Sequence, residues 1–412
     1  MLDINFIREN PDIVKNACEN KNIKVDVDRI LELDRQKRQL IQETEALKSE
    51  QNKISRSGDR SLIEKAKEIK TQIKDLEPKS EELEKELQPL LLTLPNIPFD
   101  DVPVGKDDTQ NVVVRQVNKP EKFDFQPKDY MQLAEPLDLI DTERAGKVAG
   151  SRFGYIKGDL ALLEFALINL VLDTVKKEGF KPIIPPVMIK NQIARGTGYY
   201  EAGDESEAYY LPADDLYLTG TSEQSLLAMH ADEVLQEKDL PIRYIGFSTC
   251  FRREAGSYGK DTKGILRVHQ FDKLEMFVYS TAEQSKQEHE KILAIEEKLM
   301  KDLDLPYQVL NICTGDLGRP AAKKYDIETW LPSEQKYRET HSCSNCTDFQ
   351  ARRLNIRYKD KENKMQFCHT LNGTAFAIGR ILIMIIENYQ QKDGSIKVPE
   401  ALQKYCGIKA IN

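Results

Sequence analysis

A hydrophobic repeat in the N-terminal quarter of the chain predicts two long helices. In the first half of this stretch, apolar residues recur every seven positions, at Leu33, Leu40, Leu47 and Ile54. After a polar turn at residues 55–61, the seam positions alternate spacings of three and four, at Ala66, Ile69, Ile73, Leu76, Ser80, Leu83, Leu87 and Leu90. Neither helix can bury such a stripe alone, so we predict an antiparallel helical hairpin over about residues 27–92, with arms about 40 Å long. Pro78 interrupts the second repeat and should kink or break that helix.

The helical period ends after this hairpin. Residues 94–119 are rich in Pro, Asp and Asn and show no helical spacing, which is typical of a linker between domains. We therefore expect an N-terminal domain of residues 1–102 and a second domain of residues 103–412.

The second domain alternates helical patterns with short β-rich runs. An apolar helix over residues 159–178 ends at Gly179, and the strand that follows contains Pro185 and Pro186, which restrict it to a sheet edge or an interface. Near the C-terminus, the pattern predicts a strand over residues 365–371, a turn at residues 372–374 and an apolar helix over residues 375–390. Arg380 stands in that aliphatic helix, where we expect it to meet an anion, either a protein carboxylate or a phosphate.

The most informative alternation lies within residues 243–280. Two β-rich runs, residues 244–252 and 266–279, flank a Gly- and Lys-containing loop at residues 255–264 and predict one long antiparallel hairpin. One face of the second run is apolar, and the other carries Arg267, His269, Phe271, Lys273 and Glu275. A solvated face is the ordinary expectation for such a hairpin. However, a guanidinium, a ring and a carboxylate at intervals of about 13 Å also suit an extended nucleotide.

Composition adds limited information about location and partners. Charged residues make up 31 % of the chain, the mean hydropathy is -0.55, and the apolar run at residues 381–386 is too short to cross a bilayer. The N-terminus lacks the pattern of a secretory signal, so we expect a cytoplasmic protein without a membrane anchor. The net charge is -8, but residues 35–74 hold eleven Lys and Arg against six Asp and Glu. A solvated coiled coil explains this excess, and a basic tip would also suit a nucleic-acid backbone.

The seven cysteines occupy irregular positions, which predicts reduced thiols rather than a disulfide framework. Cys343 and Cys346 form a C-x-x-C pair, with Cys368 and His369 further along. On a strand, adjacent side chains such as those of Cys368 and His369 point to opposite faces, so they would not easily reach one ion. We expect buried thiols and no structural zinc.

The segment FRREAGSYGKDTKGILRVHQFDKLE, residues 251–275, resembles motif 2 of class II aminoacyl-tRNA synthetases in the form found in seryl-tRNA synthetases. The helix of residues 159–178 and its Pro-rich strand resemble motif 1, which forms the dimer interface in that family. The segment containing Arg380 resembles motif 3, whose arginine binds the terminal phosphate of ATP. The resemblance covers essentially the whole chain. It implies an α+β fold, in which an N-terminal antiparallel coiled-coil arm precedes an antiparallel β-sheet catalytic domain flanked by helices.

The resemblance also implies an activity and its partners. Family members activate L-serine with ATP and Mg²⁺ and transfer it to tRNA(Ser), and the sequence leaves open whether tRNA(Sec) is also charged. The basic tip of the arm would bind the tRNA, and motif 1 would form a homodimer.

The resemblance assigns site residues by position. The catalytic residues implied are Arg252, Glu339 and Arg380. The residues implied for ATP are Arg252, Arg253, Glu254, Arg267, Val268, Phe271, Glu339, Thr340, His341, Ser342 and Arg380. The residues implied for serine are Thr221, Ser222, Glu223, Arg252, Glu275, Asn372 and Thr374.

Glu339 and Ser342 offer oxygen ligands that could share the Mg²⁺ carried by ATP. The chain has Glu-Thr-His-Ser here, where the family usually has Glu-Ile-Ser-Ser, so the roles of Thr340 and His341 stay open. The nearby segment DFQARR, residues 348–353, receives no role.

Two other functions compete with tRNA charging. A synthetase-like paralogue could form an aminoacyl-adenylate and load a carrier protein, but it would not need a basic coiled-coil arm. A non-catalytic RNA-binding homologue would not need to retain Arg252, Glu254, Glu275 and Arg380.

Overall fold

The computed structural model describes residues 1–57, 59–199, 207–255 and 263–412. Most of the loop expected at residues 255–264 therefore lies outside the described residues. The chain divides into two compact units, Met1–Ile97 and Pro98–Asn412. The division follows Ile97, whereas the sequence suggested a boundary after residue 102.

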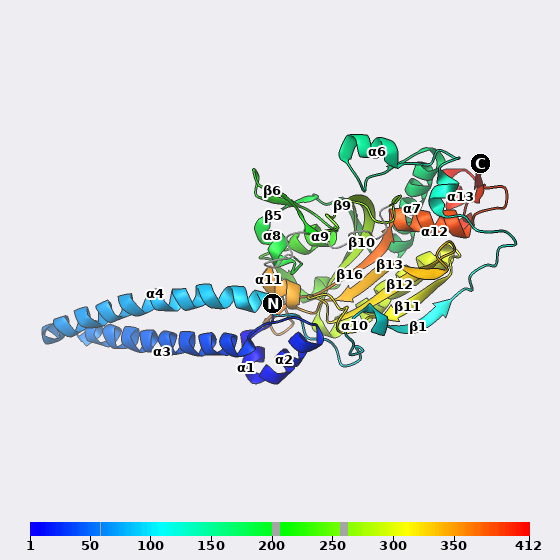
Figure 1. Cartoon of the computed structure of the whole chain (residues 1–412). Coiled ribbons are helices and arrows are strands. Elements are labelled where there is room, and N and C mark those ends of the chain that lie inside the picture. The colour runs from blue at the N-terminus through cyan, green and yellow to red at the C-terminus, as the bar shows by residue number, and fades with distance from the viewer. Residues whose placement is uncertain (58, 200–206, 256–262) are drawn as a thin grey trace. The chain divides into compact units, whose positions relative to one another are not determined.

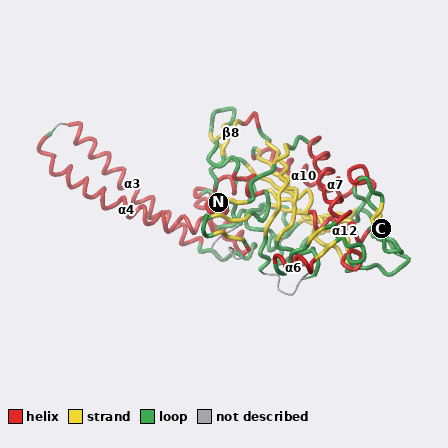
Figure 2. The backbone as a smooth tube through the Cα atoms, turned by 90° about the horizontal axis from the view of Figure 1, so that it is seen from above, coloured by secondary structure: helices red, strands yellow, loops and turns green. Residues whose placement is uncertain are grey.

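The first unit is helical. Its helices are α1 (Ile4–Glu9), α2 (Pro11–Asn20), α3 (Val27–Ser57) and α4 (Ile63–Thr93), with the short 3₁₀ helix η1 (Arg60–Leu62) before α4. Figures 1 and 2 show α3 and α4 running side by side as one hairpin. Leu33, Ile69, Ile73 and Leu87 of the seam are buried between them, so the predicted coiled-coil hairpin is confirmed.

Pro78 does not break α4, which continues through both Pro78 and Pro89, so the expected break is wrong and the alternative of a kink stays a prediction. A proline inside a helix removes one backbone hydrogen bond. Burial of the seam residues on either side, such as Ile73 and Leu87, offsets that loss against α3.

The second unit is built on a sheet of eight strands. In spatial order these are β1 (Val112–Val117), β11 (Tyr307–Asn311), β12 (Lys323–Leu331), β13 (Lys336–Asn345), β16 (His369–Ala377), β10 (Gln270–Ser280), β9 (Ile242–Phe251) and β4 (Lys181–Ile183). Every neighbouring pair is antiparallel except β4 and β9. Strand β4 lies at the edge of the sheet, as predicted, but it ends at Ile183, so it contains Pro182 and not Pro185 or Pro186. A missing backbone donor is tolerated at an edge.

Helices cover the sheet and small ribbons surround it (Figure 1). The helices are α5 (Tyr130–Ala134), α6 (Thr142–Ala149), α7 (Gly158–Lys177), α8 (Asn191–Gly196), α9 (Glu223–Ala228), α10 (Ala282–Asp302), α11 (Phe349–Arg353), α12 (Ile378–Asn388) and α13 (Glu400–Cys406). The small sheets are formed by β5 (Met188–Lys190), β7 (Leu216–Leu218) and β6 (Tyr209–Leu211), by β8 (Val234–Gln236), β14 (Arg357–Lys359) and β15 (Met365–Phe367), by β2 (Ile140–Asp141) and β3 (Tyr155–Ile156), and by β17 (Ile396–Lys397) and β18 (Ala410–Ile411).

The main hydrophobic core lies on one face of the sheet. Side chains of α7, α10 and α12 pack there against Leu274, Met276 and Val278 of β10. A second cluster on the other face joins α9 and α11 to Phe277 and Tyr279. Alternate residues of β10 therefore enter two different cores, as the period of two in a strand requires.

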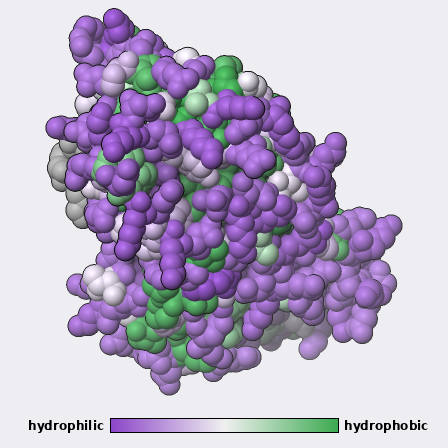
Figure 3. Space-filling model, turned by 90° about the vertical axis from the view of Figure 1, so that its right-hand side faces the viewer, coloured by the Kyte–Doolittle hydropathy of each residue, from purple (hydrophilic) through white to green (hydrophobic). Residues whose placement is uncertain are grey.

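The face of the molecule that Figure 3 shows is mostly polar. In the view of Figure 3, hydrophilic side chains cover most of the visible face, and apolar residues reach it in separate patches. Within the described ranges, none of the helices combines the length and the apolar character needed to span a bilayer.

The segment expected to be a linker contains a strand. Val112–Val117 forms β1 and pairs with β11 as the opposite edge of the main sheet. Its run of three valines and its position beside a partner strand favour extended structure. The prediction of a linker between domains is wrong for these residues, which belong to the main sheet.

The turn expected at residues 372–374 is also wrong. These residues lie inside the central strand β16, and the following helix α12 begins at Ile378. A Cβ atom at Gly373 would lie 2.2 Å from Ile292 Cγ2 and 2.7 Å from Glu296 Oε1 on α10. Glycine is present because α10 packs closely on the sheet, and not because the chain turns.

Candidate active site

The polar face of β10 forms the floor of the candidate site. From Gln270 onward the strand alternates, and the side chains of Phe271, Lys273 and Glu275 line the candidate cavities. Arg267 and His269 precede the strand, because β10 begins at Gln270 and not at residue 266 as expected. The predicted hairpin of β9 and β10 is confirmed by their continuous antiparallel pairing.

A first cavity of about 140 Å³ lies between β10, β13 and the start of α12. It is lined by nine of the residues predicted to bind ATP, which are Arg252, Glu254, Arg267, Val268, Phe271, Glu339, Thr340, Ser342 and Arg380. Thr374, predicted to bind serine, also lines this cavity. Three separate sequence segments therefore converge on one space.

The charged groups of the first cavity are arranged in pairs. Arg267 Nη1 lies 2.7 Å from Glu254 Oε2. Arg380 Nη1 donates to the Glu339 carbonyl at 2.8 Å and lies 3.4 Å from Glu339 Oε1. Arg380 thus meets a protein carboxylate, one of the two anions expected for it, while it also faces the cavity.

An aromatic ring lies beside these charges. The Arg252 guanidinium carbon is 5.3 Å from the centre of the Phe271 ring, within cation–π range. A flat ring among arginines can stack on a nucleotide base while the guanidinium groups bind phosphates.

A β-bulge brings Glu339 and Ser342 to the same cavity. In the pairing of β12 with β13, Ile327 faces His341 and Glu328 faces Glu339, so Thr340 is the extra residue. In a regular strand, residues three apart would point to opposite faces. Because of the bulge, Glu339 and Ser342 point to the same side of the strand and line the same cavity. Their carboxylate and hydroxyl oxygens are hard ligands, which Mg²⁺ prefers.

A second cavity of about 540 Å³ adjoins the first. Five residues predicted to bind serine line it, namely Thr221, Glu223, Arg252, Glu275 and Asn372. The two cavities share Arg252, Glu254, Lys273 and Ser342. A molecule in one cavity would therefore touch groups that also contact a molecule in the other.

Five carboxylates and three cationic side chains line the second cavity. Glu223 and Glu275 are both buried, and Lys273 Nζ forms an ion pair with Glu275 Oε2. Burial, together with the charge of Glu275, raises the pKa of Glu223 to about 7. A ligand that brings an ammonium group would stabilise both carboxylates in their charged form.

Three predicted residues lie outside both cavities. Arg253 is exposed beside the Tyr209 ring, and the Ser222 hydroxyl donates to the Gly246 carbonyl behind the site. His341 packs edge-on against Phe376 of the main core, and burial lowers its pKa to about 3. The side chain of His341 therefore packs in the core and does not line the cavity that Thr340 and Ser342 line.

The cysteines and histidine considered for zinc are spread over different places. Cys343 belongs to the main core and Cys368 to the cluster on the opposite face of the sheet. None of the seven cysteines, all of which lie in the described part of the chain, forms a disulfide.

Several lining residues had no assigned role. Lys273 borders both cavities, and Lys324 and Tyr199 border the second. Lys273 could have been found, because it shares the strand face of Phe271 and Glu275. Lys324 and Tyr199 come from segments whose place beside the site is set by tertiary packing, which no local pattern reveals.

Comparisons with known proteins agree with this geometry. Residues 210–389 match the model of the tRNA synthetase class II core domain (G, H, P, S and T), and residues 1–98 match that of the seryl-tRNA synthetase N-terminal domain. The sheet and its two cavities are therefore those of a class II aminoacyl-tRNA synthetase.

Individual relatives show which family within this class the chain resembles. The chain is 47 % identical to the serine–tRNA ligase of Dictyoglomus turgidum over 421 residues, which cover 100 % of this chain and 99 % of that protein. It matches the crystal structure of seryl-tRNA synthetase from Pyrococcus horikoshii complexed with ATP, with a TM-score of 0.95, 44 % identity, and coverage of 100 % of this chain and 99 % of that one. It also matches the cytoplasmic serine–tRNA ligase of Naegleria fowleri in complex with AMP, with a TM-score of 0.92, 36 % identity and the same coverages. The chain belongs to the seryl-tRNA synthetase family of serine–tRNA ligases.

Proposed function

We propose that this chain activates L-serine with ATP to seryl-adenylate and transfers the seryl group to tRNA(Ser). The observation that carries the proposal is the pair of adjoining cavities that meet at Arg252, Lys273 and Ser342. One offers an aromatic ring and guanidinium groups to a nucleotide, and the other offers buried carboxylates to a small amine. Family membership and the ATP and AMP complexes of its relatives support the same assignment.

In the first step, an oxygen of the serine carboxylate attacks the α-phosphorus of ATP, and pyrophosphate leaves. The nucleophile is already an anion, so the barrier lies mainly in bringing it against a polyanion. We assign Arg252 to the α-phosphate and the serine carboxylate, and Arg267 and Arg380 to the outer phosphates. In the second step, a hydroxyl of the terminal ribose of the tRNA attacks the seryl carbonyl, and AMP leaves.

The base and the metal have their own partners in the first cavity. Phe271 stacks on adenine, and Glu254 accepts from its exocyclic amine. Glu339 and Ser342 would hold Mg²⁺ together with phosphate oxygens and waters. The ion would supply positive charge to the departing pyrophosphate.

Serine is selected by hydrogen bonds in the second cavity. The residues that we assign to its ammonium and hydroxyl groups are Thr221, Glu223, Glu275 and Asn372, which line this cavity, and Thr374, which lines the first cavity. The Thr374 hydroxyl already donates to Glu275 Oε2 at 3.3 Å. Alanine and glycine lack the hydroxyl and would leave these buried groups unpaired, so they should be rejected strongly.

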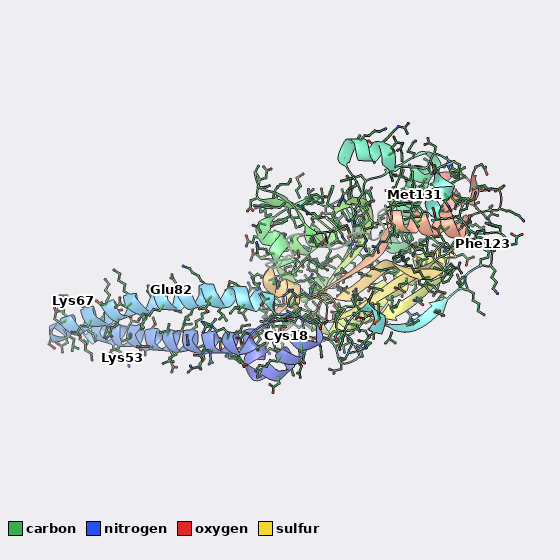
Figure 4. All side chains as sticks on the ribbon, in the orientation of Figure 1. Cys18, Lys53, Lys67, Glu82, Phe123 and Met131 are labelled. Atoms are coloured by element: carbon green, nitrogen blue, oxygen red, sulfur yellow. The ribbon has the colours of Figure 1, made fainter. Side chains whose placement is uncertain are left out.

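The arm binds the tRNA backbone. Lys53, Arg56, Lys70 and Lys74 lie in the outer half of the hairpin, where Figure 4 shows the Lys53 and Lys67 side chains further from the base than Glu82. Within the described residues, these four cations have no carboxylate partner, whereas Lys48, Lys65 and Lys67 are paired with Glu77, Glu50 and Glu64. Unpaired exposed cations suit phosphate contacts that position an RNA.

We also propose a homodimer formed through α7 and β4. Phe165 of α7 is 62 % exposed, and Ile184, directly after β4, is 86 % exposed. Large apolar side chains so exposed on α7 and directly after the edge strand β4 suit an interface. The proposed activity places the enzyme in the cytoplasm, where tRNA is charged.

Pyrophosphate exchange tests the function. The protein is incubated with ATP, labelled pyrophosphate and each of serine, alanine, glycine and threonine, and charging of tRNA(Ser) and tRNA(Sec) is measured separately. Exchange that depends on serine, followed by charging of tRNA(Ser), is the expected result. Exchange without transfer to tRNA would favour a carrier-loading paralogue, and absence of exchange with every amino acid would favour a non-catalytic RNA-binding homologue.

A further inference from the structure

The segment DFQARR, residues 348–353, sends one side chain to the acidic end of the second cavity. Gln350 of α11 is 0 % exposed, and its Nε2 donates to Glu223 Oε1 at 2.8 Å. Glu223 lines the cavity, whereas Gln350 does not. A buried amide therefore stands directly behind a carboxylate that faces the substrate.

The orientation of the Gln350 amide is determined by its other partners. Thr370 Oγ1 donates to Gln350 Oε1 at 2.7 Å, and Gln350 Nε2 donates to the Thr197 carbonyl at 3.2 Å. A backbone carbonyl can only accept, so a flipped amide would place two acceptors together at Thr197 and again at Glu223. Gln350 can consequently act toward Glu223 only as a donor.

A second donor approaches the same carboxylate. Tyr199 OH donates to Glu223, at 3.0 Å from Oε2 and 3.2 Å from Oε1. The amide and the phenol approach from separate segments and restrict the side chain of Glu223 to one position. Both donors also oppose the effect of burial and of Glu275, and each lowers the pKa of Glu223.

We propose that Gln350 is a positioning residue for serine recognition, which holds Glu223 as a fixed acceptor for the ammonium group of the substrate. This inference rests on the proposed function and deepens it, because it identifies the group that keeps the acidic end of the pocket ready to bind an amine. Gln350 itself touches no substrate. Its effect passes through Glu223 alone.

A purely structural role makes a different prediction. Gln350 also joins α11 to the segment after α8 through Thr197, so its removal could loosen the fold without affecting the ionisation of Glu223. A structural defect would lower activity equally at all pH values. Loss of a donor to Glu223 would instead act mainly where that carboxyl is partly protonated.

The first test is Gln350→Met, studied in the full chain by serine-dependent pyrophosphate exchange. At neutral pH we expect kcat/KM for serine to fall about tenfold or more, since the lost bond is to a charged group. The KM for ATP should stay within about twofold, because Gln350 lies outside the first cavity. The acid limb of the pH profile should move upward by about one unit, so that activity partly recovers at high pH.

The second test is the isosteric variant Gln350→Glu, which stays informative if the methionine variant fails to fold. A carboxyl at this position donates to Glu223 only while it carries a proton. We therefore expect kcat/KM for serine to decline with rising pH above neutrality, opposite to the trend of Gln350→Met.

Gln390→Met provides a matched control. Gln390 is also buried and donates to the carbonyls of Lys128 and Glu387, away from both cavities. Loss of the Gln390 amide should change the midpoint of thermal unfolding. The pH profile of serine-dependent exchange should stay the same as that of the wild type. Wild-type pH profiles in both Gln350 variants would overturn the proposal, as would a loss that does not vary with pH. Failure of the proposed function is distinct, because the wild type itself would then show no serine-dependent exchange.

Discussion

Lys273 and Glu275 form an ion pair across 2.5 Å, with side chains that are only 7 % and 3 % exposed. They stand two residues apart on β10, so the pleat of the strand directs both to the same face. Lys273 borders both cavities, whereas Glu275 borders the second. The pair therefore places a buried cation where, in the proposed reaction, the serine carboxylate meets the α-phosphate.

Removal of this cation should impair the chemical step. For Lys273→Met we expect kcat for serine-dependent exchange to fall about 100-fold or more, because a preorganised positive charge near the reacting anions is lost. Steady-state exchange kinetics measure the effect. Lys273→Arg keeps the charge and should recover part of the rate.

Lys323→Met is the control for the loss of a buried lysine. Lys323 Nζ lies 2.6 Å from Asp101 Oδ2, and neither residue lines the first or the second cavity. Each methionine variant leaves a carboxylate unpaired, so both should lower the free energy of unfolding, by up to about 3–5 kcal/mol for the more buried pair. Only Lys273→Met should lower kcat, and an equal loss of rate in the two variants would argue against a role of Lys273 in catalysis.

Loss of the carboxylate of the pair should abolish serine use. In Glu275→Ala, neither the substrate hydroxyl nor Lys273 retains its partner, so we expect serine-dependent exchange to become undetectable even at saturating serine. Binding of ATP, measured by calorimetry, should change little. Glu297→Ala breaks the ion pair with Arg115 outside both cavities and should keep its exchange activity. Near-normal exchange in Glu275→Ala would refute the assignment of the serine pocket.

Local periodicity was sufficient to predict the floor of the site and the arm. The alternation of Phe271, Lys273 and Glu275 identified the polar face of β10, because side chains of a strand repeat every two residues. The spacing of Leu33, Ile69 and their neighbours likewise identified the seam of the coiled coil. Both features depend only on residues close in sequence.

Features set by pairing and packing were not predictable. The bulge at Thr340 arises from the register of β13 against β12, and it alone decides that Glu339 and Ser342 share a cavity while His341 turns to the core. Asn372–Gly373 is typical of a turn by composition, yet the approach of α10 makes it part of a central strand. Such contacts join residues far apart in sequence.

The close approach at Gly373 can be tested through stability. In Gly373→Ala the new methyl group would lie 2.2 Å from Ile292 Cγ2, so α10 or β16 must move. We expect the free energy of unfolding, measured in urea, to fall by about 1–3 kcal/mol. Gly146→Ala in α6 is the control, because a Cβ atom at this position would have no atom within 4 Å. The free energy of unfolding of this variant should be unchanged or higher by up to about 1 kcal/mol. Equal stability of the two variants would contradict the packing argument.

The proposed dimer interface can be tested by placing a charge on α7. Phe165→Asp would bury an unpaired carboxylate in the interface, so the variant should run as a monomer in light scattering at concentrations where the wild type is a dimer. Val104→Asp adds the same charge at a residue that is 73 % exposed on another segment, and it should remain dimeric. If light scattering gave the Phe165→Asp protein the same dimer mass in solution as the wild type, this surface would be ruled out as the interface.

The arm should contribute to tRNA binding but not to adenylate formation. Replacement of Lys53, Arg56, Lys70 and Lys74 by Gln removes four exposed cations that have no carboxylate partner in the described part of the arm. We expect the KM for tRNA(Ser) to rise about tenfold or more and its dependence on salt to weaken. Each lost phosphate contact reduces the slope of log affinity against log salt concentration by about 0.7–0.9.

The control variants are Lys79→Gln and Lys85→Gln, at residues that are exposed on α4 nearer its C-terminal end. They should charge tRNA like the wild type. Serine-dependent exchange should be the same in all of these proteins, because the residues that line the two cavities come from the second unit alone. A parallel loss of exchange and charging would mean that the arm is not a separate RNA-binding element.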